Sequence, residues 1–156
     1  MADYLLAVDM GLKTGLALYA ADGRLVWYRS RNFGASGRLR RGVRTILHDL
    51  PGLAWLVIEG GGPLADIWLK EAQRRGVSTL QISAETWRTS LLYDRQQRTG
   101  QKAKQTALAM ARRVIAWSNL PGPTALRHDA AEAILIGLWA VREVGWLSRL
   151  PANLQP

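Results

Sequence analysis

The sequence contains no cysteine. This absence excludes disulfide bonds, cysteine-ligated iron–sulfur or zinc sites and thiol nucleophiles, and it is consistent with a reducing compartment. No apolar run reaches the roughly 18 residues that a membrane helix requires. The N-terminal residues also lack the basic and apolar regions of a secretory signal peptide. We therefore expect a soluble cytoplasmic protein that has no membrane partner.

Acidic residues are scarce relative to basic ones. The chain has 12 Asp and Glu against 21 Lys and Arg, which gives a net charge of +9 and a pI near 10.8. Arginine supplies most of the positive charge, and its planar guanidinium group suits phosphate binding. A surface of this kind favours a nucleic acid as the partner over a charge that only maintains solubility.

The length and composition are those of one globular domain. The 156 residues are 48% hydrophobic and 21% charged, which excludes a disordered chain and leaves no room for two full domains. We expect a single domain over residues 1–150 and a short C-terminal tail over residues 151–156.

The hydrophobic pattern predicts three meandering strands followed by alternating strands and helices. Asp22-Gly23 is typical of a hairpin turn, and Pro51-Gly52 is expected to end the first helix. The predicted strands cover residues 4–10, 15–21, 24–31, 54–59 and 77–82. The predicted helices cover 35–49, 64–75, 84–88, 102–117 and 129–145, with a polar loop over 93–101. This order predicts an α/β domain with a mixed five-stranded sheet flanked by helices.

Two acidic residues lie where predicted strands end. Asp9 follows the first apolar strand and Glu59 closes the fourth. A carboxylate buried in such a position must be paired, protonated or metal-bound, whereas an isolated one at a strand end commonly faces solvent. If the two strands are neighbours, Asp9 and Glu59 form a small acidic cleft at the edge of the sheet.

Asp129 and Glu132 form a second acidic pair at the start of the last helix. Their spacing of three residues places them on one side of that helix. The same spacing is also typical of a helix-capping pattern, which would need no functional site. Packing of this helix on the sheet would bring both acids toward Asp9 and Glu59.

Four carboxylates in a small volume repel one another, and divalent cations relieve this repulsion. Oxygen ligands without cysteine or clustered histidine favour Mg²⁺ or Mn²⁺ over zinc. Two such ions support in-line displacement at a phosphodiester. A basic surface together with an acidic metal site therefore indicates a nuclease.

Three segments resemble the motifs of RuvC-type Holliday junction resolvases. Val8-Asp9-Met10-Gly11 with Thr14-Gly15-Leu16-Ala17 resembles the first motif, and Ile58-Glu59 resembles the second. Residues 128–137, which contain Asp129 and Glu132, resemble the last. The segments occur in the family's order over nearly the whole chain, and Trp87-Arg88 is similar to a pair shared by the chloroplast and phage branch. At position 132, bacterial resolvases often carry Asp instead of Glu, which lengthens one ligand arm here.

The resemblance implies a ribonuclease H-like fold, a homodimer, two divalent metal ions per active site and paired symmetric nicks across a four-way DNA junction, in recombination and repair. It implies that Asp9, Glu59, Asp129 and Glu132 are catalytic metal ligands. Lys104 is favoured over Lys102 as a lysine near the scissile phosphate. Expected DNA contacts are Lys102, Arg88, Arg38, Arg40, Arg41, Arg95 and Arg98. A cytoplasmic, nucleoid-associated protein of host or phage origin fits this reading.

Three alternatives differ from this reading. Actin-like sugar kinases share an Asp-x-Gly opening, but they need two related domains and a much longer chain. A YqgF-like nuclease would process structured RNA instead of branched DNA. A non-catalytic junction- or RNA-binding module is disfavoured by the four acids, because acidic groups facing phosphate gain nothing for binding alone.

Overall fold

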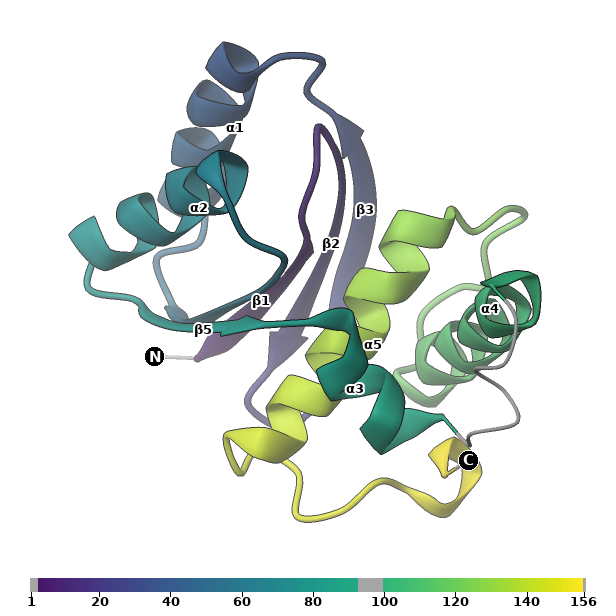
Figure 1. Ribbon diagram of the computed structural model, residues 1–156. Helices are drawn as coiled ribbons and strands as arrows, with labels where there is room; N and C mark the ends of the chain where they lie inside the picture. The colour runs from purple at the N-terminus through teal and green to yellow at the C-terminus, as the bar shows by residue number, and fades with distance from the viewer. Residues whose placement is uncertain (1–2, 93–99, 156) are drawn as a thin grey trace.

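The computed structural model describes residues 3–92 and 100–155, which form one mixed sheet covered by helices on both faces (Figure 1). The strands are β1 (Tyr4–Asp9), β2 (Lys13–Ala20), β3 (Leu25–Asn32), β4 (Leu53–Glu59) and β5 (Ser78–Ile82). The helices are α1 (Ser36–His48), α2 (Pro63–Arg74), α3 (Ala84–Leu91), α4 (Gly100–Trp117), α5 (His128–Glu143) and the 3₁₀ helix η2 (Ala152–Leu154).

The strand order is β3-β2-β1-β4-β5. β1, β2 and β3 pair antiparallel as a meander, while β4 and β5 run parallel to β1. The ends of β1, β4 and β5 therefore lie on one edge of the sheet, together with the end of β3. We call this the carboxyl edge. Since α1, α2 and α3 follow β3, β4 and β5 directly, all three helices begin at this edge.

Two hydrophobic cores lie on the two faces of the sheet. One is packed by α1 and α2, which contribute Leu39, Val43, Ala65 and Trp68. The other is packed by α3, α4 and α5 (Figure 1). Alternate residues of the central strands point to opposite cores, as the period of a strand requires: Leu6 and Val8 lie in the first core, while Leu5 and Ala7 lie in the second.

Helix α5 is the central helix of the second layer. Every residue from Ala130 to Val141 is buried, because α5 contacts β1, β2 and β3 on one side and α3 and α4 on the other. A helix that is apolar all round needs such an enclosed position. The charged residues that it does carry at its N-terminal end are therefore placed by the packing of the whole helix.

The predicted α/β architecture with a mixed five-stranded sheet is confirmed, with shifts at element ends. The stretch predicted over 84–88 continues as α3 to Leu91, and α4 begins at Gly100 inside the predicted loop 93–101. Gly100 and Gln101 supply no apolar side chain to the core, so hydrophobic periodicity does not detect this first turn. In the segment expected to be a tail, Leu154 of η2 is fully buried in the second core.

No helix in the described part of the chain is long and apolar enough to cross a membrane.

Candidate metal centre

A single row of paired residues crosses the sheet at the carboxyl edge. Ser30 of β3 pairs with Gly15 of β2, Gly15 pairs with Asp9 of β1, and Asp9 pairs with Glu59 of β4. Glu59 in turn pairs with Ile82 of β5. The predicted juxtaposition of Asp9 and Glu59 is confirmed, because the strands that carry them are parallel neighbours in register.

Backbone contacts fix the ends of β1 and β4. The amide of Met10 donates to the carbonyl of Glu59 at 3.4 Å, and the amide of Gly60 donates to the carbonyl of Ile82 at 3.1 Å. Gly60 has φ +114°, a backbone conformation that residues other than glycine rarely adopt. The chain therefore turns sharply away immediately after Glu59, which leaves this carboxylate at the strand end.

Gly15 lets α5 approach the sheet. A Cβ atom built on Gly15 would lie 1.9 Å from the carbonyl oxygen of Asp129, so any side chain at this position would collide with the backbone of α5. Farther along α5, a Cβ atom on Gly137 would lie 2.2 Å from the ring of Tyr19. The close fit at both glycines seats the first turns of α5 over the row of paired residues.

Three carboxylates converge in this place. Oxygens of Asp9, Glu59 and Glu132 all lie within 4.8 Å of one another, and we call these residues the acidic cluster. The side chain of Glu132 is only 10% exposed, while Asp9 and Glu59 are half-buried. The Oε2 atom of Glu59 is buried without a hydrogen-bond partner. An unsatisfied carboxylate oxygen beside two further carboxylates is a position that a cation can fill.

Crowding changes the protonation of the acidic cluster. Burial, followed by repulsion from Glu132 and Glu59, raises the pKa of Asp9 from 3.8 to about 8. Burial and repulsion from Glu132 also raise the pKa of Glu59, although Arg88 and the indole of Trp87 oppose this change. Without a metal, burial and mutual repulsion therefore favour retention of a proton by the acidic cluster.

Two side chains, Arg88 and His128, contact the cluster through Glu132. Arg88 of α3 donates to Oε1 of Glu132 at 2.8 Å, and Nε2 of His128 lies 3.0 Å from the same oxygen. The Nδ1 atom of His128 is buried and has no hydrogen-bond partner. Arg88 was expected to contact DNA, and the structure places its guanidinium group against the acidic cluster.

Asp129 lies outside the acidic cluster. Its Oδ1 atom accepts a hydrogen bond from the hydroxyl of Ser30 and one of 2.8 Å from the amide of Ala130. The expected convergence of four carboxylates is therefore reduced to three. The N-cap of α5 is Arg127, which makes no side-chain capping hydrogen bond, so Asp129 and Glu132 do not form the expected capping pattern.

A small pocket lies beside Asp129, at the Ser30 end of the row of paired residues. It has a volume of about 250 Å³ and is lined by Lys13, Ser30, Arg31, Asn32, Arg127 and Asp129. Three of these residues, Lys13, Arg31 and Arg127, are cationic, and none of them was predicted from the sequence. Lys13 of β2 pairs with Asn32 of β3, and the next residue of β2, Thr14, pairs with Arg31 of β3. Only strand register brings these residues to Arg127, which is far away in the sequence.

The other predicted contacts are dispersed. Lys102 and Lys104 are exposed on the first turns of α4, and no hydrogen bond or ion pair among the described residues joins Lys104 to the acidic cluster. Arg38, Arg40 and Arg41 are exposed on the first turns of α1, which begins at the carboxyl edge. Arg95 and Arg98 lie outside the described residues.

The acidic cluster has the chemistry of a site for a hard divalent cation. All its donors are carboxylate oxygens, the ligands that Mg²⁺ and Mn²⁺ prefer. One of these oxygens has no hydrogen-bond partner, and burial together with mutual repulsion disfavours the charged forms of Asp9 and Glu59 when no cation is bound. The residues present therefore fit a bound divalent metal.

The fold is similar to that of a protein of known structure. Comparison with known structures finds T. thermophilus RuvC in complex with Holliday junction substrate, with a TM-score of 0.62 and 18% sequence identity. The match covers 92% of this chain and 96% of that chain. No family model matches the sequence, and no curated protein does. At this identity the likeness establishes the RuvC-like, ribonuclease H-like fold.

Proposed function

We propose that this protein is a metal-dependent endonuclease that resolves four-way DNA junctions by paired symmetric nicks. The observation that carries the proposal is the acidic cluster, three carboxylates within 4.8 Å at the carboxyl edge of a RuvC-like sheet. A chain with a net charge of +9 has no general need to crowd acids together. A metal site facing a polyanionic substrate explains both properties.

Asp9, Glu59 and Glu132 hold the Mg²⁺ or Mn²⁺ ion in this proposal. A bound divalent ion supplies activation of the attacking water and stabilisation of the leaving oxygen. Asp129 completes the ligands for a second ion once its carboxylate leaves the hydroxyl of Ser30, with which it is hydrogen-bonded in this structure. In this proposal α5 would supply two ligands, Asp129 and Glu132, from its N-terminal end.

The cationic residues around the acidic cluster orient its ligands and the substrate. Arg88 and His128 hold Oε1 of Glu132, which fixes the direction of this carboxylate. Lys13, Arg31 and Arg127 line the adjacent pocket and bind a phosphate next to the one that is cleaved. Such contacts position the strand but do not read its sequence. Lys104 is the lysine that we assign to the scissile phosphate.

A homodimer accounts for the symmetry of the proposed reaction. A four-way junction offers two equivalent strands, and a two-fold symmetric dimer presents one acidic cluster to each of them. Each protomer then makes one nick, which gives the paired product.

The test is cleavage of a synthetic mobile four-way junction with Mg²⁺ or Mn²⁺. We expect symmetric nicks from the wild-type protein and a loss of about a thousandfold or more for Asp9→Asn and for Glu59→Gln, because each removes a metal ligand. Asp49→Asn is the matched control, since Asp49 is exposed at the end of α1 and lies outside the acidic cluster.

Linear duplex DNA and an RNA hairpin serve as comparison substrates. Cleavage of RNA alone would assign the protein to RNA processing. Tight junction binding without cleavage in the presence of Mg²⁺ or Mn²⁺ would indicate that the protein is a non-catalytic binding module. Equal cleavage by the wild type and Asp9→Asn would show that the acidic cluster is not required for cleavage.

A further inference from the structure

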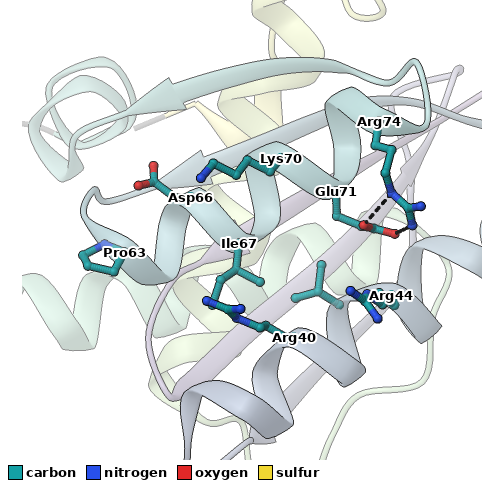
Figure 2. Close-up of a pocket in the computed structure, with 9 residues that line it drawn as sticks. Arg40, Arg44, Pro63, Asp66, Ile67, Lys70, Glu71 and Arg74 are labelled. Atoms are coloured by element: carbon teal, nitrogen blue, oxygen red, sulfur yellow. Dashed lines mark hydrogen bonds and ion pairs between the residues drawn. The ribbon is translucent and has the colours of Figure 1, made fainter.

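A second polar groove lies between α1 and α2, on the face of the sheet opposite α5. It has a volume of about 470 Å³ (Figure 2). Helix α1 contributes Arg40, Val43 and Arg44, and α2 contributes the residues from Pro63 to Arg74 that face α1. We call it the α1–α2 groove.

Cationic side chains occupy both walls of the α1–α2 groove. Arg40 and Arg44 are four residues apart on α1, and Lys70 and Arg74 are four residues apart on α2. Residues at this spacing lie one above the other on a helix face. The groove therefore has two cationic rows along its length. Like charges arranged in this way repel one another unless an anion lies between them.

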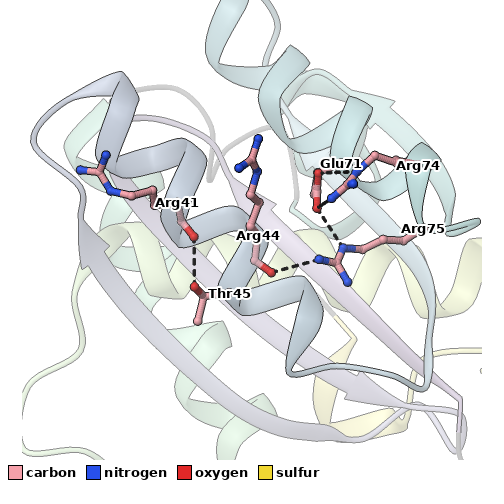
Figure 3. A network of polar contacts seen from close by, with 6 residues as sticks. All are labelled: Arg41, Arg44, Thr45, Glu71, Arg74 and Arg75. Carbon is pink, nitrogen blue, oxygen red and sulfur yellow. Dashed lines mark hydrogen bonds and ion pairs between the residues drawn. The ribbon is translucent and has the colours of Figure 1, made fainter.

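The acids of the groove neutralise these rows only in part. Glu71 is paired with two arginines, Arg74 at 2.6 Å and Arg75 at 3.0 Å (Figure 3). The hydrogen bonds from Arg74 lower the pKa of Glu71. The Glu71 carboxylate therefore stays ionised and paired with Arg74 and Arg75. Arg75 also donates to the carbonyl of Arg44 at 3.4 Å, which links α2 to α1.

Three cations of the groove remain without a salt bridge. Among residues 3–92 and 100–155, no salt bridge involves Arg40, Arg44 or Lys70. Asp66 is the remaining acid of the lining, so the groove as a whole has an excess of two positive charges. Its charge and its open form suit an extended anion better than an apolar peptide.

The direction of the groove relates it to the acidic cluster. Both helices begin at the carboxyl edge, and α2 starts at Pro63, directly after the glycine turn that follows Glu59. The residues of α2 that line the groove extend from Pro63 to Arg74, which at 1.5 Å per residue corresponds to about 16 Å. This length matches several successive phosphates of one strand.

We propose that the α1–α2 groove binds the phosphodiester backbone of a nucleic-acid arm that extends away from the acidic cluster. The proposal rests on the proposed function for the identity of the nucleic acid, but the anion binding itself requires no catalysis. Arg40, Arg44 and Lys70 contact phosphates in this arrangement. Arg75, which is paired with Glu71 on α2, joins the two walls through the carbonyl of Arg44 on α1.

The experiment measures binding of a labelled four-way junction and a labelled linear duplex in the presence of EDTA. The variant is Arg44→Gln/Lys70→Gln, which preserves helix propensity and leaves the Arg44 carbonyl available to Arg75. The control is Arg29→Gln/Arg149→Gln, which removes the same charge from two exposed residues outside both sites. Affinities are measured between about 50 and 200 mM salt.

We expect the groove variant to bind more weakly and with a log–log salt dependence shallower by about two, one for each lost phosphate contact. The ratio of the control's DNA affinity to the variant's DNA affinity then decreases roughly tenfold between about 50 and 200 mM salt. Thermal unfolding and light scattering on the same proteins establish that folding and mass are unchanged.

Three results would overturn the proposal. The first is equal affinity and salt dependence for the groove variant and the control. The second is a changed molecular mass for the groove variant, which would make the groove a protein contact. The third is saturable binding of inorganic phosphate or a nucleoside diphosphate that displaces no DNA, which would make it a small-anion site. Because cleavage is not measured, loss of the proposed nuclease activity would leave the binding result intact.

Discussion

At the scale of single residues, the acidic cluster combines charges that elsewhere in the molecule are kept apart. Asp9, Glu59 and Glu132 share one small volume, whereas Glu71, in the other layer, is surrounded by arginines. Burial raises the pKa of both carboxylates, but the acidic neighbours of Asp9 add to this change, whereas the arginines bound to Glu71 outweigh it. The pKa of Asp9 is raised and that of Glu71 is lowered.

The raised pKa of Asp9 predicts a pH-dependent stability of the metal-free protein. The unfolded chain releases this proton near the ordinary value of 3.8, whereas the folded chain keeps it up to about pH 8. The folded state therefore binds more protons between these values, and the free energy of unfolding falls as pH rises through them, by up to about 1.4 kcal/mol per pH unit for one proton.

Asp9→Asn removes the titrating carboxyl group, so this residue no longer contributes to the difference in bound protons between the folded and unfolded states. In EDTA, urea unfolding at pH 5, 7 and 9 should show a smaller loss of stability with rising pH for Asp9→Asn than for the wild type. The Asp49→Asn control should follow the wild type. Parallel curves for all three proteins would show that Asp9 ionises normally in the folded state.

The position of Asp129 predicts that the two acids of α5 differ in metal binding. Calorimetric titration of Mn²⁺ without DNA should show affinity reduced about tenfold or more by Glu132→Gln, because this change removes a direct ligand. Asp129→Asn should have a smaller effect, since the Asp129 carboxylate is bound by Ser30. Equal losses would mean that Asp129 leaves Ser30 before DNA arrives.

At the scale of elements, the site depends on how closely α5 lies on β2. Helix α5 is long, apolar and buried on all sides, so its position is decided by packing rather than by its charged first turn. Gly15 gives the space that the backbone of Asp129 occupies. The Thr14-Gly15 part of the first motif therefore has a packing role, while Asp9 carries the charge.

Gly15→Ala should damage both stability and the site. Its Cβ atom would lie 1.9 Å from a backbone oxygen, so α5 must move, and we expect a loss of about 1–3 kcal/mol in urea unfolding. Junction cleavage should fall as well, because Glu132 moves together with α5. Gly37→Ala is the control: Gly37 is exposed in α1, and alanine there should stabilise the helix by about 0.5–1 kcal/mol. Unchanged stability of Gly15→Ala would show that α5 does not lie this close to β2.

At the scale of the whole molecule, one sheet separates two layers with different charge arrangements. The layer of α3, α4 and α5 brings Glu132 to the acidic cluster, and the layer of α1 and α2 carries the α1–α2 groove (Figure 1). Both meet at the carboxyl edge because the helices that follow β3, β4 and β5 begin there. A substrate bound at this edge contacts both layers.

The proposed paired nicks predict a homodimer in solution. Light scattering should give twice the chain mass of 17.3 kDa, and cross-linked dimers should form on a junction that carries two cleavable strands. A mixture of wild type with an excess of Asp9→Asn should yield junctions cut on one strand only. A monomeric mass at all concentrations, with or without the junction, would contradict the paired mechanism.

The sequence by itself predicted the elements and all three clustered acids, with Asp129 as a fourth that lies outside the cluster. Hydrophobic periodicity located every strand, and the apolar runs that end in Asp9 and Glu59 needed only parallel neighbouring strands to bring these residues together. The strands and helices follow from local sequence patterns, and the approach of Asp9 to Glu59 requires only that two strands pair. The amino-acid sequence is therefore sufficient to predict these features. The basic composition likewise follows from the sequence alone.

Only the tertiary structure decided which of the predicted acids lie together in the acidic cluster. Asp129 and Glu132 are three residues apart, yet one is held by Ser30 and the other enters the acidic cluster. The cause is the seating of α5 on Gly15, a contact between residues more than a hundred positions apart. The pocket around Lys13 and the α1–α2 groove also combine separate elements. Sequence patterns report the spacing of side chains along one element, whereas such sites depend on how closely several elements pack.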